Sequence, residues 1–149
     1  MIPKDWECYA KILPIHLTYI MTFALAGGGK VMNFAPTVGY FTKKFETTFL
    51  VSLPGGMGPQ VAAIAGGELI IVAVLVVSLI KGEFLPNRDR LFLKLGIFGS
   101  SIMFLNLGFG MRLVRDHSSA ASLFTYFALT QLLFFAICHS CQKEQGKSQ

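Results

Sequence analysis

Four long apolar runs constrain the fold of this chain more than any other feature of its sequence. They cover approximately residues 12–30, 61–80, 91–111 and 120–137. Each is close to the roughly 20 residues that an α-helix needs to cross about 30 Å of hydrocarbon. Residues 69–80 have almost no polar side chain, whereas a helix of a soluble bundle needs one polar face. The runs therefore predict an all-α, four-helix transmembrane bundle, with residues 1–149 as a single transmembrane domain and a polar tail over residues 138–149.

The composition agrees with membrane spans and argues against two other classes of protein. Hydrophobic residues make up 53% of the chain and charged residues 14%, compared with roughly 25% charged residues in an average soluble domain. A soluble enzyme of this composition would lack the polar residues for its surface. The net charge of +5 does not indicate nucleic-acid binding, because the basic residues flank apolar runs and form no patch with interleaved aromatics. We therefore expect lipids, and no nucleic acid, as partners.

The distribution of basic residues predicts the orientation in the membrane. Four spans place both termini on one side, and the mixed charges of the first eleven residues favour a retained first span over a cleaved leader. Basic residues concentrate on the cytoplasmic or matrix side of membrane proteins. The terminal side has eight of them and the other side has five: Lys4, Lys11, Lys81, Arg88, Arg90, Lys94, Lys143 and Lys147 against Lys30, Lys43, Lys44, Arg112 and Arg115. Both termini are thus expected on the matrix or cytoplasmic side.

The connection between the first two spans carries an amphipathic pattern. Val38, Phe41, Phe45 and Phe49 recur at spacings of three, four and four residues, which places them on one face of a helix. One interpretation is a short interfacial helix that lies on the membrane. The alternative is a connecting loop whose aromatic side chains pack on the bundle.

Three polar residues from three spans are predicted to lie at a similar depth. Lys30 ends the first span, Glu68 lies about 10 Å into the second, and Asn106 lies about 8 Å into the third. Ionisable groups at membrane depth are costly and normally face the bundle interior. We therefore expect Lys30 to pair with Glu68, with Asn106 as a further partner, either as a lock between helices or as a ligand site.

Other polar and small residues in the spans indicate helix packing. Gly27, Gly66 and Gly67 permit close approach of helices, and His16 and Gln131 are expected to join helices by hydrogen bonds. Cys138 and Cys141 have the spacing of half a metal site, but a zinc site needs two more ligands and the sequence has no second pair. We therefore expect reduced thiols there, no metal and no catalytic constellation.

Two short motifs resemble those of the DoxX family of small four-helix membrane proteins. Residues 26–31, AGGGKV, are similar to the way the family closes its first helix, and residues 65–69, AGGEL, are similar to the way it opens its second. The resemblance covers about residues 15–137 and selects Gly27, Lys30 and Glu68. It implies a four-helix bundle and a link to thiosulfate–quinone oxidoreduction or to membrane oxidoreductase assemblies.

These observations predict a non-catalytic accessory subunit of a larger energy-transducing, respiratory-type membrane complex. Its partners would be other membrane subunits, and the chain alone would bind no cofactor. The alternative is a redox-linked component of electron transport that acts with a quinone or a sulfur compound near Lys30 and Glu68. The mitochondrial inner membrane is preferred over a bacterial plasma membrane.

Overall fold

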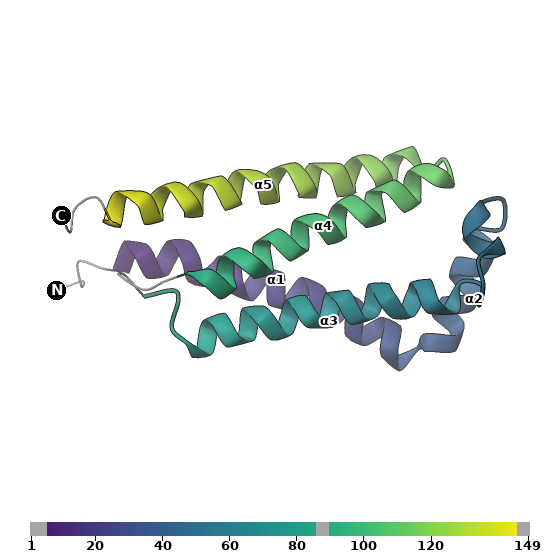
Figure 1. Cartoon of the computed structure of the whole chain (residues 1–149), viewed down its shortest axis with the longest axis horizontal. Helices are drawn as coiled ribbons and strands as arrows, with labels where there is room; N and C mark the ends of the chain where they lie inside the picture. Colours follow the sequence, from purple (N-terminus) through teal and green to yellow (C-terminus); the bar gives the residue numbers. More distant parts are fainter. Residues whose placement is uncertain (1–5, 86–89, 146–149) are drawn as a thin grey trace.

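The computed structural model describes residues 6–85 and 90–145, with side chains described for residues 12–85 and 90–138. Within these ranges the chain forms five α-helices and one short 3-10 helix. The α-helices are α1 (Trp6–Met32), α2 (Phe34–Lys44), α3 (Gly58–Ile80), α4 (Leu91–Leu113) and α5 (His117–Gln145), and the 3-10 helix is η1 (Phe49–Ser52). Figure 1 shows the start of α1 and the end of α5 at the same end of the bundle, with α2 at the other end.

Four of these helices are long and apolar enough to cross a membrane, as the sequence predicts. The spans are Ile12–Met32, Gly58–Ile80, Leu91–Leu113 and His117–Cys138. The chain is therefore an integral, multi-pass membrane protein. The boundaries of the spans differ by up to three residues from those of the apolar runs. The helix α3 extends back to Gly58, and this is compatible with Pro59 because proline fits the first turn of a helix.

The four spans pack as two antiparallel pairs, and the main contact between the pairs is that of α3 with α4. α1 packs on α3, α4 packs on α5, and α3 joins the pairs by packing on α4. The core includes Phe23, Leu75, Leu93 and Ile97, which are almost completely buried. Most of α5 faces outward, since 11% of its span is buried inside the protein compared with 39% of the α4 span.

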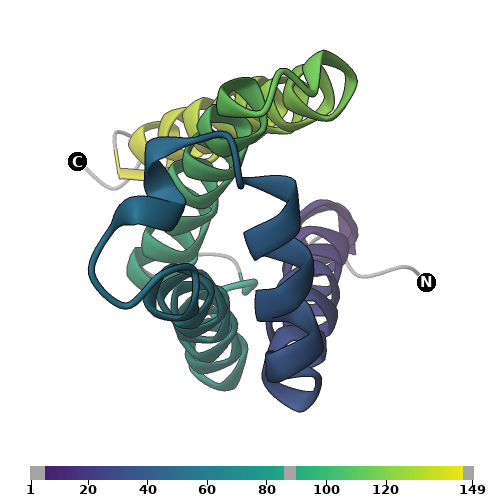
Figure 2. The same ribbon diagram turned by 90° about the vertical axis from the view of Figure 1, so that its right-hand side faces the viewer.

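The connection between α1 and α3 contains the helix that the amphipathic pattern predicts. Figure 2 views the bundle from the end opposite the two termini, and in this view α2 lies across that end. Val38 and Phe41 lie on α2, but Phe45 is its C-cap and Phe49 belongs to η1, so the predicted face does not continue as one helix. Phe45 is buried and Phe49 is exposed. The connection therefore combines features of both interpretations, a short helix and an aromatic residue that is buried against the bundle.

Candidate functional site

Lys30 and Glu68 form an ion pair between α1 and α3. Lys30 Nζ lies 2.7 Å from Glu68 Oε1 and 2.8 Å from Oε2, and it also donates to the Ala26 carbonyl oxygen at 3.2 Å. An ammonium group has three N–H donors, so these three acceptors match its full capacity. The Glu68 side chain is 2% exposed and the Lys30 side chain is 17% exposed. The carboxylate is therefore sealed inside the protein, where its counter-charge is the Lys30 ammonium.

A glycine allows α1 and α3 to approach closely enough for this pair. A Cβ atom added to Gly27 would lie 3.1 Å from Glu68 Cβ and 3.2 Å from Leu69 Cγ. Gly27 precedes Lys30 by three residues, so the two lie on the same face of α1. The missing side chain thus leaves room for α3 beside the Lys30 stem.

The carboxylate lies deeper than the sequence predicted. Because α3 begins at Gly58, Glu68 is ten residues, or about 15 Å, from that end of the helix. It is twelve residues, or about 18 Å, from Ile80 at the other end. Glu68 is therefore near the middle of the span, where an unpaired charge is most costly.

The other residues predicted for this site have different surroundings. The Asn106 side chain is exposed, and among the described residues no hydrogen bond joins it to Lys30 or Glu68. A Cβ atom at Gly67 would lie 2.5 Å from Met103 Cε of α4, whereas one at Gly66 would have open space around it. The structure therefore brings together Gly27, Lys30 and Glu68 but leaves Asn106 outside the pair, and Gly66 outside any close helix contact.

A second polar network joins three helices at the opposite end of the bundle. The Ser78 hydroxyl donates to Glu83 Oε2 at 2.8 Å, and His16 Nε2 lies 2.8 Å from Ser78 Oγ. His16 Nδ1 also lies 3.2 Å from the Ile12 carbonyl oxygen, so which partner donates in the His16–Ser78 bond depends on the tautomer of the imidazole. Glu83 also accepts from the backbone N–H groups of Phe92 at 3.1 Å and Leu93 at 2.7 Å. His16, Ser78 and Glu83 are all buried.

Of the three residues of this network, sequence reasoning selected only His16 and missed Ser78 and Glu83. Glu83 lies in the turn after α3, and its carboxylate caps the first turn of α4 from nine and ten residues upstream. The sequence signal that could have indicated an external cap is the residue at the N-cap position of α4. Arg90 stands there and makes no side-chain cap bond, so an acceptor had to come from elsewhere in the chain.

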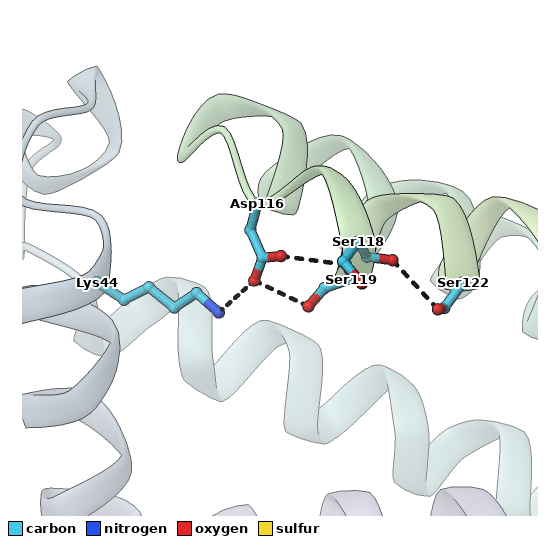
Figure 3. A network of polar contacts seen from close by, with 5 residues as sticks. All are labelled: Lys44, Asp116, Ser118, Ser119 and Ser122. Carbon is cyan, nitrogen blue, oxygen red and sulfur yellow. Dashed lines mark hydrogen bonds and ion pairs between the residues drawn. The ribbon is translucent and has the colours of Figure 1, made fainter.

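A third cluster ties α2 to the turn between α4 and α5 (Figure 3). Asp116 accepts from the Ser119 backbone N–H at 3.1 Å, from the Ser119 hydroxyl at 2.8 Å and from Lys44 Nζ at 3.1 Å. These donors, Ser119 before Lys44, lower the pKa of Asp116 to about 2. The same contact raises the pKa of Lys44, chiefly through its hydrogen bond to Asp116.

The remaining polar candidates stay separate from these clusters. Cys138 is a half-buried free thiol, and the Cys141 side chain lies outside the part of the chain whose side chains are described. Gln131 is half-buried on α5. Within the described residues, no group of three or more His, Cys, Asp and Glu side chains could hold a metal ion.

Comparison with protein-family models, with curated proteins and with solved structures gives no match. The resemblance to the DoxX family therefore stays a prediction from two short motifs, and the geometry of the polar clusters is the basis for a functional proposal.

Proposed function

We propose that this chain is a non-catalytic accessory subunit of a larger energy-transducing membrane complex. The observation that carries the proposal is how the chain uses its intramembrane polar groups. Lys30–Glu68 joins α1 to α3, and His16–Ser78–Glu83 joins α1, α3 and the start of α4. Tyr19 Oη bonds to Thr130 Oγ1 at 2.7 Å and joins α1 to α5. Each group is engaged in holding helices together.

The exposure of α5 supports a role in assembly. This helix packs mainly on α4 and presents large apolar residues outward, among them Tyr126, Leu129, Leu132 and Phe135. In hydrocarbon such a face is equally suited to lipid or to the helix of another subunit. A chain in which these three polar contacts join helices and whose apolar faces are open suits a scaffold better than a reaction centre.

The membrane and the orientation belong to the same proposal. The excess of basic residues on the terminal side supports termini that face the matrix or the cytoplasm. The resemblance to DoxX proteins supports an energy-transducing membrane, with the mitochondrial inner membrane preferred.

Purification from native membranes in a mild detergent tests this function. We expect the chain to migrate within a large assembly together with other membrane subunits. Recovery of the chain only as a free monomer would contradict the proposal.

The variant Glu68→Gln separates this function from the redox alternative at Lys30 and Glu68. An accessory role predicts less assembled complex, with unchanged electron transfer per assembled complex. The exposed Glu46→Gln provides a matched control for loss of one carboxylate. Loss of electron transfer in fully assembled complex, with Glu46→Gln unaffected, would favour the redox alternative.

A further inference from the structure

A hollow of about 280 Å³ lies beneath α2 and η1, between the start of α3 and the end of α4. Its apolar lining is rich in aromatic rings and thioethers, with Phe41, Phe45 and Phe109 beside Met57, Met103 and Met111. Phe109 is 54% exposed, so the hollow is open on the outer face of the bundle. None of the lining residues belongs to the Lys30–Glu68 pair.

Two side-chain amides line this otherwise apolar space. Gln60 Nε2 donates to the Leu50 carbonyl oxygen at 3.4 Å, while Gln60 Oε1 is buried without a hydrogen-bond partner. The amide cannot be turned over, because a carbonyl oxygen facing the Leu50 carbonyl would leave two acceptors in contact. Gln60 Oε1 therefore lacks a donor, and a buried acceptor without one costs about 1–3 kcal/mol.

Asn106 supplies the second amide, from α4. It lies seven residues before Leu113, about 10 Å from the end of the helix, and within the described part of the chain its side chain makes no hydrogen bond. An amide in a span normally bonds to a neighbouring helix. Gln60 and Asn106 thus come from two helices, line the same hollow and both have unused hydrogen-bonding capacity.

We propose that this hollow binds a lipid-soluble molecule with a hydroxyl-bearing aromatic ring, of the alkylphenol class. The hydroxyl donates to Gln60 Oε1, which reaches it by a small rotation about the soft terminal torsion, with Nε2 still facing the Leu50 carbonyl oxygen. Asn106 provides a second polar contact, and the Phe and Met side chains pack on the ring. A cavity of roughly 150 Å³ holds benzene, so this hollow has room for a substituted ring and the start of an alkyl chain.

The test measures binding of para-hexylphenol to the full chain in lipid nanodiscs, with empty nanodiscs subtracted to remove partitioning into lipid. Its methyl ether, para-hexylanisole, has the same shape but no donor. We expect the phenol to bind above the lipid background and the ether to bind two- to tenfold more weakly, the range for one net neutral hydrogen bond. Equal binding of phenol and ether, or phenol binding no higher than in empty nanodiscs, would overturn the proposal.

Variants locate the site. Gln60→Leu and Asn106→Leu should each weaken phenol binding two- to tenfold, and Gln60→Leu should remove the preference for phenol over ether. Gln131→Leu, which removes an amide from α5 outside the hollow, should leave binding unchanged. Ala63→Phe places a ring at an exposed lining position and should abolish binding in a protein with an unchanged helical spectrum. Undiminished binding to folded Ala63→Phe would refute the assignment of the site, whether or not Gln60→Leu folds.

Discussion

Removal of Lys30 should destabilise the bundle more than removal of its partner. The Glu68 side chain is 2% exposed and about 15 Å from the nearer end of α3, so Lys30→Met leaves a carboxylate that cannot reach water. Breaking a buried ion pair by removing one partner costs about 3–5 kcal/mol. Glu68→Gln leaves the ammonium instead, and the long Lys30 stem, already 17% exposed, can extend toward the membrane surface. We expect Glu68→Gln to lower the free energy of unfolding by about 2 kcal/mol, near the contribution of one charge-assisted hydrogen bond.

The double variant Lys30→Met/Glu68→Gln gives the decisive comparison. With both charges gone, it should be more stable than Lys30→Met alone by about 1–3 kcal/mol, because no buried charge remains. Equilibrium unfolding in mixed micelles measures all four free energies. Additive losses, with the double variant less stable than either single variant by the full sum, would refute the argument that the two residues act as one pair.

Three further predictions concern other contacts. Glu83→Ala should cost about 2 kcal/mol of unfolding free energy and speed hydrogen exchange in the first turn of α4, because two backbone N–H groups lose their acceptor; exposed Glu46→Ala should change neither. Gly27→Leu should cost about 1–3 kcal/mol by forcing α1 from α3, whereas Gly28→Leu, which points into open space, should be tolerated; equal losses would count against the close approach. For Asp116, whose folded pKa of about 2 lies below its ordinary value of 3.8, the stabilisation is complete above that ordinary value and is lost as pH falls through about 2. The difference in melting temperature between the wild type and Asp116→Asn should therefore be constant from neutral pH to about pH 5 and shrink toward pH 2; a difference independent of pH would contradict the assignment.

The apolar runs predicted the spans because a membrane span is a local feature of the sequence: a helix of about 20 apolar residues is long enough to cross the hydrocarbon core. The Lys30–Glu68 contact was predictable because ionisable groups within apolar spans normally face the bundle interior and pair there, although the depth inferred for Glu68 was too shallow. Depth does not give the direction in which a side chain points. Asn106 lines the hollow between α3 and α4 and makes no described hydrogen bond to the pair, an outcome that depends on how α4 packs against α3.

The N-cap residue Arg90 indicates that α4 needs a cap from elsewhere in the chain, but local pattern does not identify Glu83 as the residue that supplies it. Helix caps are usually recognised from residues within one turn of the helix start, and Glu83 lies eight residues before Leu91. Its role depends on the path of the intervening turn. The hollow beneath α2 was hidden for the same reason, because it forms where α2, η1, α3 and α4 meet.

Lipid solvation of the four outward helix faces is the central claim, and spin-label accessibility tests it most directly. Single labels at Leu25, Ile70, Ile102 and Leu132 would place one probe on an exposed apolar position of each span, in a background without the native cysteines. In vesicles, each label should collide more often with oxygen, which dissolves in lipid, than with a water-soluble nickel complex; a label at exposed Lys43 should show the reverse preference. Preferential collision of the four span labels with the nickel complex would contradict the account.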